Sequence, residues 1–124
     1  MTQRTVLYVE DNEYNRKIVR QLLGRTSYQL VEAVDGESGV ALAQQIVPQL
    51  ILMDVQLPKM SGLDATRALK ADPRTSDIPI IVITSFALSG DREKAAVAGA
   101  DNYLAKPYSP RELLALVRQY LPEA

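Results

Sequence analysis

Five apolar runs alternate with segments of helical spacing along this chain of 124 residues. Three of the runs, at residues 6–9, 50–53 and 80–83, are almost continuously apolar. A strand has this composition when helices cover both faces of its sheet, as in a parallel sheet. The alternation predicts an α/β fold with a doubly wound, five-stranded parallel sheet. Its strands are expected at residues 5–9, 29–34, 50–53, 79–83 and 102–105.

The segments between these runs carry apolar residues at helical spacing. Near the amino terminus one stripe comprises Tyr14, Ile18 and Leu22 together with Val19 and Leu23. We expect Tyr14, Ile18 and Leu22 to belong to the core rather than to a partner surface. Two further stripes comprise Val40, Ala43 and Val47, and then Leu113, Leu116, Val117, Tyr120 and Leu121. The basic residues Arg16, Lys17 and Arg20 are expected to form a solvated face.

Helix ends are also marked in the sequence. Ser109 followed by Pro110 has the form of an N-cap with proline at the first helical position. Ser89 is a candidate N-cap for the helix expected around residues 92–98. Gly24 and Gly99 are suited to C-terminal caps. With no linker or low-complexity tract, the sequence predicts one domain over residues 1–124.

Two absent residue types narrow the chemistry. The chain has no cysteine, which excludes disulfides and thiolate chemistry, and no histidine, so it cannot itself form phosphohistidine. A net charge of -1 lacks the basic excess typical of a nucleic-acid binder. No apolar stretch is long enough to span a membrane, and no signal peptide is visible. We therefore expect a cytoplasmic protein without a nucleic-acid or membrane partner.

Polar side chains close four of the five predicted strands. Because the carboxyl ends of parallel strands share one edge of a sheet, these side chains are expected to lie close together. They are Glu10-Asp11 after the first strand, Asp54 after the third, Thr84-Ser85 after the fourth, and Lys106-Pro107 after the fifth. Each pair taken alone also fits an ordinary turn, cap or surface role, and their shared position favours a functional site.

Crowded carboxylates repel one another, and a hard cation relieves the repulsion. Mg²⁺ takes oxygen ligands, usually one or two carboxylates with water and phosphate oxygens. Asp11 and Asp54 are the expected direct ligands, and Glu10 could reach the ion through water. With Lys106 and Thr84 alongside, Asp54 could act as the nucleophile of a phosphoryl transfer, in which each partner faces one phosphoryl oxygen.

Several short motifs in this order resemble the receiver domains of response regulators. They are Glu10-Asp11-Asn12, Leu52-Met53-Asp54, Gln56-Leu57-Pro58, Ser61-Gly62, Thr84-Ser85 and Lys106-Pro107. The similarity covers nearly the whole chain and is greatest to single-domain members of the DivK and CheY types. It implies a flavodoxin-like, three-layer fold with strand order 2-1-3-4-5.

The resemblance also implies roles for matching residues. Asp54 is the phosphoacceptor. Mg²⁺ is bound by Asp11, Asp54 and the backbone carbonyl of Gln56, with Glu10 assisting. Thr84 and Lys106 contact the phosphoryl group, and the Lys106–Pro107 bond is cis. Tyr103 is the aromatic residue that turns inward as Thr84 moves.

In this family the phosphoryl group comes from a sensor histidine kinase or a histidine phosphotransfer protein. A downstream protein then binds the face formed by the fourth helix, the fifth strand and the fifth helix. Such a chain is a signalling phosphoacceptor rather than an enzyme, although it promotes its own phosphoryl transfer and autodephosphorylation. Gln56 and Phe86 occupy positions that tune phosphate lifetime, and bulky Phe86 leads us to expect a long-lived phosphorylated state.

Three alternatives compete with this interpretation. A haloacid-dehalogenase-type phosphatase needs a second Asp two residues after the nucleophile, where this chain has Gln56. A flavodoxin-like electron carrier needs a phosphate-binding loop after the first strand, where this chain has acidic Glu10 and Asp11. A degenerate receiver that binds partners without phosphorylation also remains, although every expected site residue is present.

Overall fold

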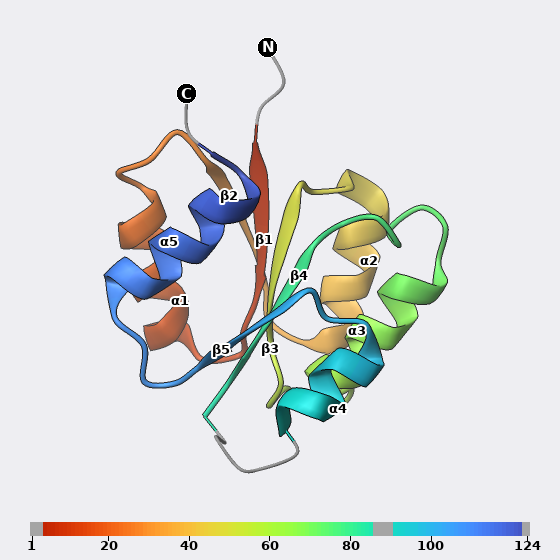
Figure 1. Cartoon of the computed structure of the whole chain (residues 1–124). Helices are drawn as coiled ribbons and strands as arrows, with labels where there is room; N and C mark the ends of the chain where they lie inside the picture. The colour runs from red at the N-terminus through yellow and green to blue at the C-terminus, as the bar shows by residue number, and fades with distance from the viewer. Residues whose placement is uncertain (1–3, 86–90, 123–124) are drawn as a thin grey trace.

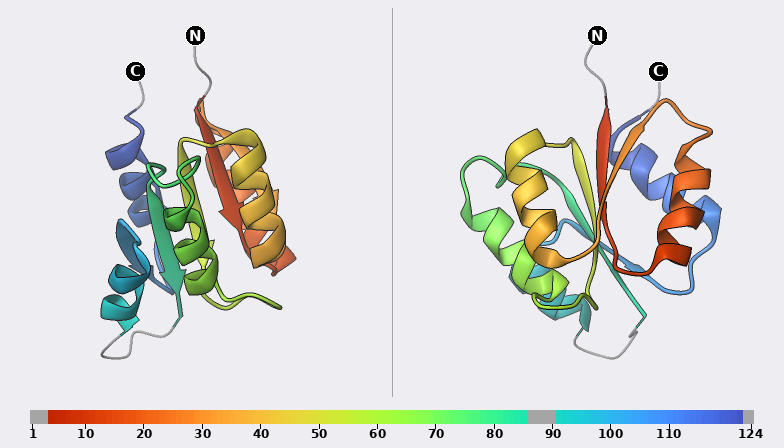
Figure 2. Two further views of the ribbon diagram at one scale, coloured as in Figure 1. Left: turned by 90° about the vertical axis from the view of Figure 1, so that its right-hand side faces the viewer. Right: turned by 180° about the vertical axis from the view of Figure 1, so that it is seen from behind.

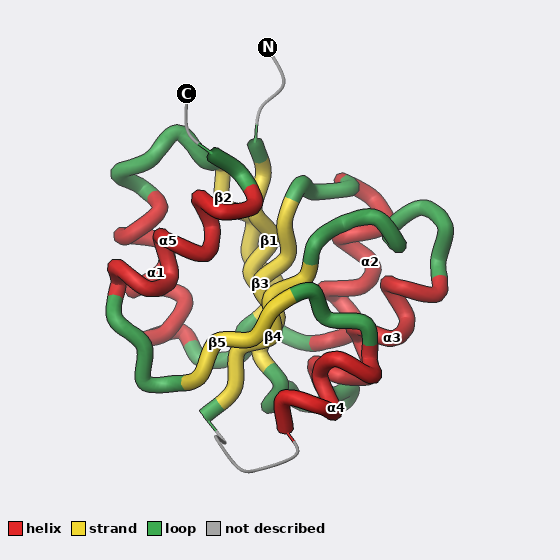
Figure 3. Tube along the Cα trace, in the orientation of Figure 1, coloured by secondary structure: helices red, strands yellow, loops and turns green. Residues whose placement is uncertain are grey.

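The structure is a computed structural model that describes residues 4–85 and 91–122. Its five strands are all parallel and lie in the order β2-β1-β3-β4-β5, which confirms the predicted sheet and its topology. The strands are β1 (Thr5–Val9), β2 (Gln29–Ala33), β3 (Leu50–Asp54), β4 (Ile80–Thr84) and β5 (Asn102–Ala105). Figure 3 shows them as the central layer of the molecule, with helices on both sides.

Five helices follow the strands in turn and form the two outer layers. They are α1 (Glu13–Leu23), α2 (Gly36–Ile46), α3 (Gly62–Ala71), α4 (Asp91–Ala98) and α5 (Pro110–Tyr120). Helices α1 and α5 cover one face of the sheet, whereas α2, α3 and α4 cover the other (Figure 1). The rear view in Figure 2 shows the same division.

Each strand supplies side chains to two separate cores, because successive residues of a strand point to opposite faces. On β1, Val6 and Tyr8 pack under α1 and α5 with Val19 and Val117. The alternate residues of β1, Leu7 and Val9, pack under α2 and α3 with apolar residues that include Ala43, Ala65 and Leu69. The continuous apolar runs of the sequence are therefore strands buried from both sides.

Side-chain caps fix where the helices begin. Ser109 accepts a hydrogen bond from the Glu112 backbone, and the Glu112 side chain accepts one from the Ser109 backbone, which completes a capping box ahead of Pro110. Asn12 caps α1 by accepting a hydrogen bond from the backbone amide of Asn15. The predicted cap Ser89 lies outside the described residues.

Two predictions about element ends and faces were wrong in detail. The second strand ends at Ala33, and Val34 is exposed beyond it. Val47 does not extend the apolar stripe of α2, because it follows the helix as an exposed C-cap with φ of 45°. Gly24 is the C-cap of α1, as predicted, and it has an ordinary φ of −63°.

Gly62 allows the backbone to approach closely below the end of β3. A Cβ atom at this position would lie 1.9 Å from the carbonyl oxygen of Asp54. Only glycine fits this contact, and the Gly62 amide donates a hydrogen bond to the Val55 carbonyl. The start of α3 is therefore packed directly against the backbone of Asp54.

None of the described helices combines the length and apolar character that crossing a bilayer requires.

Candidate functional site

The polar residues that close the strands meet at one edge of the sheet. Glu10 follows β1, Asp54 ends β3, Thr84 ends β4 and Lys106 follows β5. These four strands are adjacent in the sheet. Because all strands are parallel, their carboxyl ends bring together residues that are up to 96 positions apart in the chain.

Lys106 links the two buried carboxylates of this site. Its ammonium nitrogen lies 3.1 Å from Oε1 of Glu10 and 3.3 Å from Oδ2 of Asp54. The peptide bond between Lys106 and Pro107 is cis. Burial opposes protonation of Lys106, but the charges of Asp54 and Glu10 outweigh it and raise the pKa of the amine. Lys106 is therefore a fixed positive charge beside both acids.

Glu10, Asp11 and Asp54 form an acidic cluster. Glu10 is 1% exposed and Asp54 is 4% exposed, whereas Asp11 lies open to solvent. Each offers a carboxylate oxygen, and these three oxygens lie within 4.8 Å of one another. Three oxygen donors at this spacing could hold a metal ion.

The electrostatics of the cluster reflect crowded negative charge. Burial raises the pKa of Asp54 to about 7, and the neighbouring Glu10 adds to the shift. Burial and Glu10 also raise the pKa of Asp11. Burial opposes ionisation of Glu10 too, but Asp54 and Lys106 outweigh it and lower the pKa of Glu10 to about 2. The cluster therefore favours a cation over a further negative charge.

Gln56 joins the loops that follow β3 and β4. Its backbone amide donates to Oδ1 of Asp54 at 3.1 Å, which orients the carboxylate. Its side-chain oxygen accepts a hydrogen bond from the Ser85 hydroxyl at 2.8 Å. The two loops are thus connected across the edge where Asp54 lies.

Comparison with known proteins identifies the family. The model of the response regulator receiver domain matches residues 6–118. The chain belongs to this family. It is 39% identical to the polar-differentiation response regulators DivK of Brucella anthropi and Brucella ovis, over 98% of each chain. As a receiver of this kind it is a phosphoacceptor component of two-component signalling.

Solved structures support the same assignment. The receiver domain of a Pseudomonas aeruginosa sensor histidine kinase, with a magnesium ion coordinated in its active-site cleft, matches with a TM-score of 0.89. It is 34% identical, and the match covers 98% of this chain and 100% of that one. A chemotaxis response regulator of Vibrio cholerae matches with the same TM-score at 27% identity, over 96% and 99% of the two chains.

The receiver places the two expected switch residues on neighbouring strands. Thr84 is almost fully buried at the end of β4, and half-buried Tyr103 pairs in register with Val82 of the same strand. The guanidinium group of Arg92 lies over the Tyr103 ring, 5.2 Å from its centroid. A cation at this distance is attracted by the face of the ring. Phe86 lies outside the described residues.

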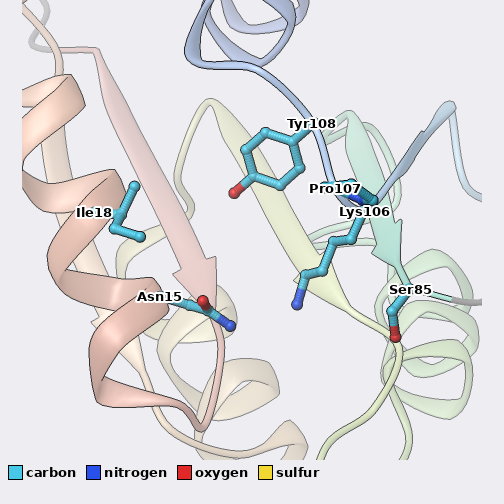
Figure 4. Close-up of a pocket in the computed structure, with 6 residues that line it drawn as sticks. All are labelled: Asn15, Ile18, Ser85, Lys106, Pro107 and Tyr108. Carbon is cyan, nitrogen blue, oxygen red and sulfur yellow. The ribbon is translucent and has the colours of Figure 1, made fainter.

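A pocket of about 460 Å³ lies beside the acidic cluster. It is lined by Asn15 and Ile18 of α1, Ser85 after β4, and Lys106, Pro107 and Tyr108 after β5. In Figure 4 the ammonium group of Lys106 and the hydroxyl of Tyr108 point into the space between α1 and the segment after β5. The pocket therefore combines apolar walls with polar groups at its base.

The expectation that the stripe of Tyr14, Ile18 and Leu22 is core was wrong for Tyr14 and Ile18, which are 71% and 39% exposed. Leu22 packs against the core as expected. Val19 and Leu23, which belong to the same expected stripe, are buried against the sheet. Ile18 lies 100° around the helix from Val19, so it turns away from the sheet toward the pocket.

The expected solvated face of α1 is confirmed for Lys17 and Arg20, which are exposed, but not for Arg16. The Arg16 side chain is only 12% exposed, and it donates to the backbone carbonyl of Glu10 at 2.9 Å. Arg20 makes a two-pronged contact with Glu32 of β2, at 2.8 and 2.7 Å. These contacts hold the start of α1 and the Glu10 backbone against β2.

Three contributors to the site were missed in the sequence. Tyr8 reads as part of an apolar strand, yet its hydroxyl donates to Oε1 of Glu10 at 3.2 Å. Asn15 donates to the same oxygen at 3.2 Å. Tyr108 lines the pocket. Its hydroxyl lies close enough to that of Tyr8 for each phenol to shift the pKa of the other. One indication of this role was present in the sequence. Tyr8 lies two positions before Glu10, so the two side chains point to the same face of the sheet.

Proposed function

We propose that Asp54 is the phosphoacceptor of this receiver and takes its phosphoryl group from a phosphohistidine on a partner protein. The observation that carries this proposal is the position of the Asp54 carboxylate. It lies almost fully buried at the end of a central strand, 3.3 Å from the Lys106 ammonium group and within the acidic cluster.

The donor set fits Mg²⁺. Glu10, Asp11 and Asp54 supply hard oxygen ligands, and exposed Asp11 leaves one side of the cluster open for water. We propose Asp11, Asp54 and the backbone carbonyl of Gln56 as ligands, with Glu10 assisting. When bound, Mg²⁺ would neutralise charge on the phosphoryl oxygens during transfer.

In the proposed transfer, a carboxylate oxygen of Asp54 attacks the phosphorus of the donor phosphohistidine. A P–O bond forms to Asp54 while the P–N bond breaks, and the imidazole nitrogen leaves with that electron pair. Lys106 then pairs with a phosphoryl oxygen, as does the hydroxyl of Thr84. This histidine-free chain cannot supply the donor itself, so a sensor histidine kinase or histidine phosphotransfer protein must provide it.

The pocket beside the site is the proposed place where that donor approaches. Ile18 presents apolar surface on α1, and Pro107 and Tyr108 face it across the pocket. Tyr14, one turn earlier on α1, is also exposed. Exposed apolar groups beside a groove are typical of protein contact sites. A helix seated here would bring its side chains to the Lys106 ammonium group, which lies at the pocket wall.

We propose that Thr84 and Tyr103 link phosphorylation of Asp54 to a change in the partner-binding face. When Thr84 is drawn toward the phosphoryl group, Tyr103 moves, and the contact between its ring and Arg92 must change. The face formed by α4, β5 and α5 then alters its affinity for a downstream protein. This switch has two conformational states, and the charge added by phosphorylation shifts the equilibrium between them.

The lifetime of the phosphorylated state is proposed to depend on Gln56. Its hydrogen bond from Ser85 holds the side chain across the loops that border Asp54. A side chain fixed here restricts the approach of water to the phosphorylated carboxylate. We therefore propose that autodephosphorylation is slow.

A cytoplasmic location remains a prediction.

Treatment with acetyl phosphate tests the proposal. With Mg²⁺, the intact mass of the wild-type chain should increase by one phosphoryl group, and the Asp54→Asn variant should remain unmodified. Chelation of Mg²⁺ should abolish the adduct. Equal modification of the Asp54→Asn variant would contradict the assignment. The complete set of site residues does not favour the alternative of a receiver that works without phosphorylation.

A further inference from the structure

Tyr8 is an unusual residue in the otherwise apolar β1 strand. Its ring is fully buried in the core beneath α1 and α5. A buried tyrosine hydroxyl needs a hydrogen-bond partner, because leaving it unpaired costs free energy. In this structure the hydroxyl donates to Oε1 of Glu10 at 3.2 Å.

Oε1 of Glu10 receives three donors in total. Besides the Tyr8 hydroxyl, it accepts from Nδ2 of Asn15 at 3.2 Å and from Nζ of Lys106 at 3.1 Å. Oε2 accepts from the backbone amide of Asn12 at 3.3 Å. Both oxygens of this buried carboxylate are therefore held, and its orientation toward Asp11 and Asp54 is fixed by its surroundings.

The donors differ in what they do to the charge of Glu10. Lys106 offsets its negative charge, and the proposed transfer directs Lys106 toward the phosphoryl group. Tyr8 and Asn15 are neutral, so they hold the carboxylate without removing the charge that attracts a cation.

We propose that Tyr8 is a positioning residue that, together with Asn15, holds Glu10 in place for divalent-cation binding while Lys106 serves the phosphoryl group. This inference rests on the proposed function, since it assigns a task within the same site. Groups that orient a metal-binding side chain typically affect affinity by about tenfold when removed.

The alternative is that Tyr8 only fills the core. The variant Tyr8→Phe separates the two roles, because it keeps the ring and removes the hydroxyl. Tyr28→Phe is the matched control. Tyr28 is also a buried tyrosine of the same core, but its hydroxyl donates to the backbone carbonyl of Leu121, which follows α5.

The experiment measures Mg²⁺ affinity by isothermal titration calorimetry, with thermal unfolding as a check on folding. We expect Tyr8→Phe to weaken Mg²⁺ binding by about tenfold, whereas Tyr28→Phe leaves it unchanged. The rate of phosphorylation by acetyl phosphate should recover in Tyr8→Phe as Mg²⁺ is raised to saturation. Asn15→Ala, which changes a half-buried surface residue, should weaken Mg²⁺ binding in the same direction.

Wild-type affinity in both Tyr8→Phe and Asn15→Ala would overturn the inference and leave the proposed function intact. An equal loss of affinity in Tyr28→Phe would also overturn it, because a general effect on the core would then explain the result. If the wild-type chain binds no Mg²⁺, the proposed function fails together with this inference.

Discussion

Lys106 and Asp54 are 52 residues apart in the chain, yet the Lys106 ammonium nitrogen lies 3.3 Å from Oδ2 of Asp54. The two residues come from strands separated by β4, and they meet because all three strands run in one direction. Without this ammonium group, two buried carboxylates would face each other uncompensated. The ion pair between Lys106 and Asp54 therefore sets both the charge balance of the metal-free site and its response to pH.

The first prediction concerns the stability of the metal-free chain. The pKa of Asp54 rises from its usual value near 3.8 to about 7, so between these values the folded state binds a proton that the unfolded state lacks. Stability therefore falls as the pH rises through this range. We expect Asp54→Asn to be more stable than wild type at pH 8 without Mg²⁺, by on the order of 2 kcal/mol.

Urea denaturation at pH 5.5 and pH 8 checks this prediction, and the advantage of the variant should grow by about 2 kcal/mol from pH 5.5 to pH 8. The pKa of Glu10, lowered to about 2, affects stability only below its unfolded value, so it does not disturb the comparison. Added Mg²⁺ should stabilise wild type more than the variant. A variant less stable than wild type at pH 8 would refute the prediction.

The second prediction concerns phosphate lifetime. Shortening Gln56 to asparagine should break its hydrogen bond with Ser85 and open the loops beside Asp54 to water. We expect Gln56→Asn, and Ser85→Ala with it, to lose the phosphoryl group several-fold faster than wild type. Phe86→Glu is expected to accelerate the loss as well. Phosphate release after removal of acetyl phosphate measures the rate, and unchanged or slower release would count against the proposal.

The third prediction concerns the phosphodonor. Ile18→Asp places a charge on the apolar wall of the pocket and should slow transfer from a phosphorylated histidine phosphotransfer protein by about tenfold. Phosphorylation by acetyl phosphate should be unchanged, because that small donor needs no docking surface. Val97→Asp is the control, since Val97 is an exposed apolar residue on α4. Equal slowing in both variants would argue against a docking role for the pocket.

The fourth prediction concerns Gly62. A Cβ atom there would lie 1.9 Å from the carbonyl oxygen of Asp54, so Gly62→Ala must displace the backbone below the phosphoacceptor. We expect a loss of about 3 kcal/mol in unfolding free energy and a lower Mg²⁺ affinity. Gly24→Ala, at an ordinary φ of −63°, should change stability by less than about 1 kcal/mol. Similar losses in the two variants would contradict the steric argument.

The strand-end residues of the site could be predicted from the sequence because a parallel sheet gathers carboxyl ends at one edge. Glu10, Asp54, Thr84 and Lys106 each follow or end an apolar run, so the pattern alone placed them together. No knowledge of side-chain contacts was needed for this step. The same reasoning predicted the acidic cluster, whose oxygens lie within 4.8 Å of one another.

The contacts that depend on packing could not be predicted in this way. Helical spacing gave α1 an apolar stripe through Tyr14 and Ile18, but spacing does not say how far the sheet beneath the helix extends. Val19 and Leu23 of this stripe meet the sheet and Leu22 packs against the core, whereas Tyr14 and Ile18 lie exposed. The hydrogen bond from Tyr8 to Glu10 could not be predicted either, because the sequence does not show which group the hydroxyl of a buried tyrosine contacts.

Lys106 directly follows β5, which lies at the edge of the sheet and pairs with β4 alone. Edge strands commonly open before the centre of a domain unfolds. Partial detachment of the final strand would carry the ammonium group away from Asp54 while the four remaining strands stayed paired. Competence to accept phosphate would then be lost under milder conditions than those that melt the molecule, so signalling would depend on the integrity of its least anchored strand.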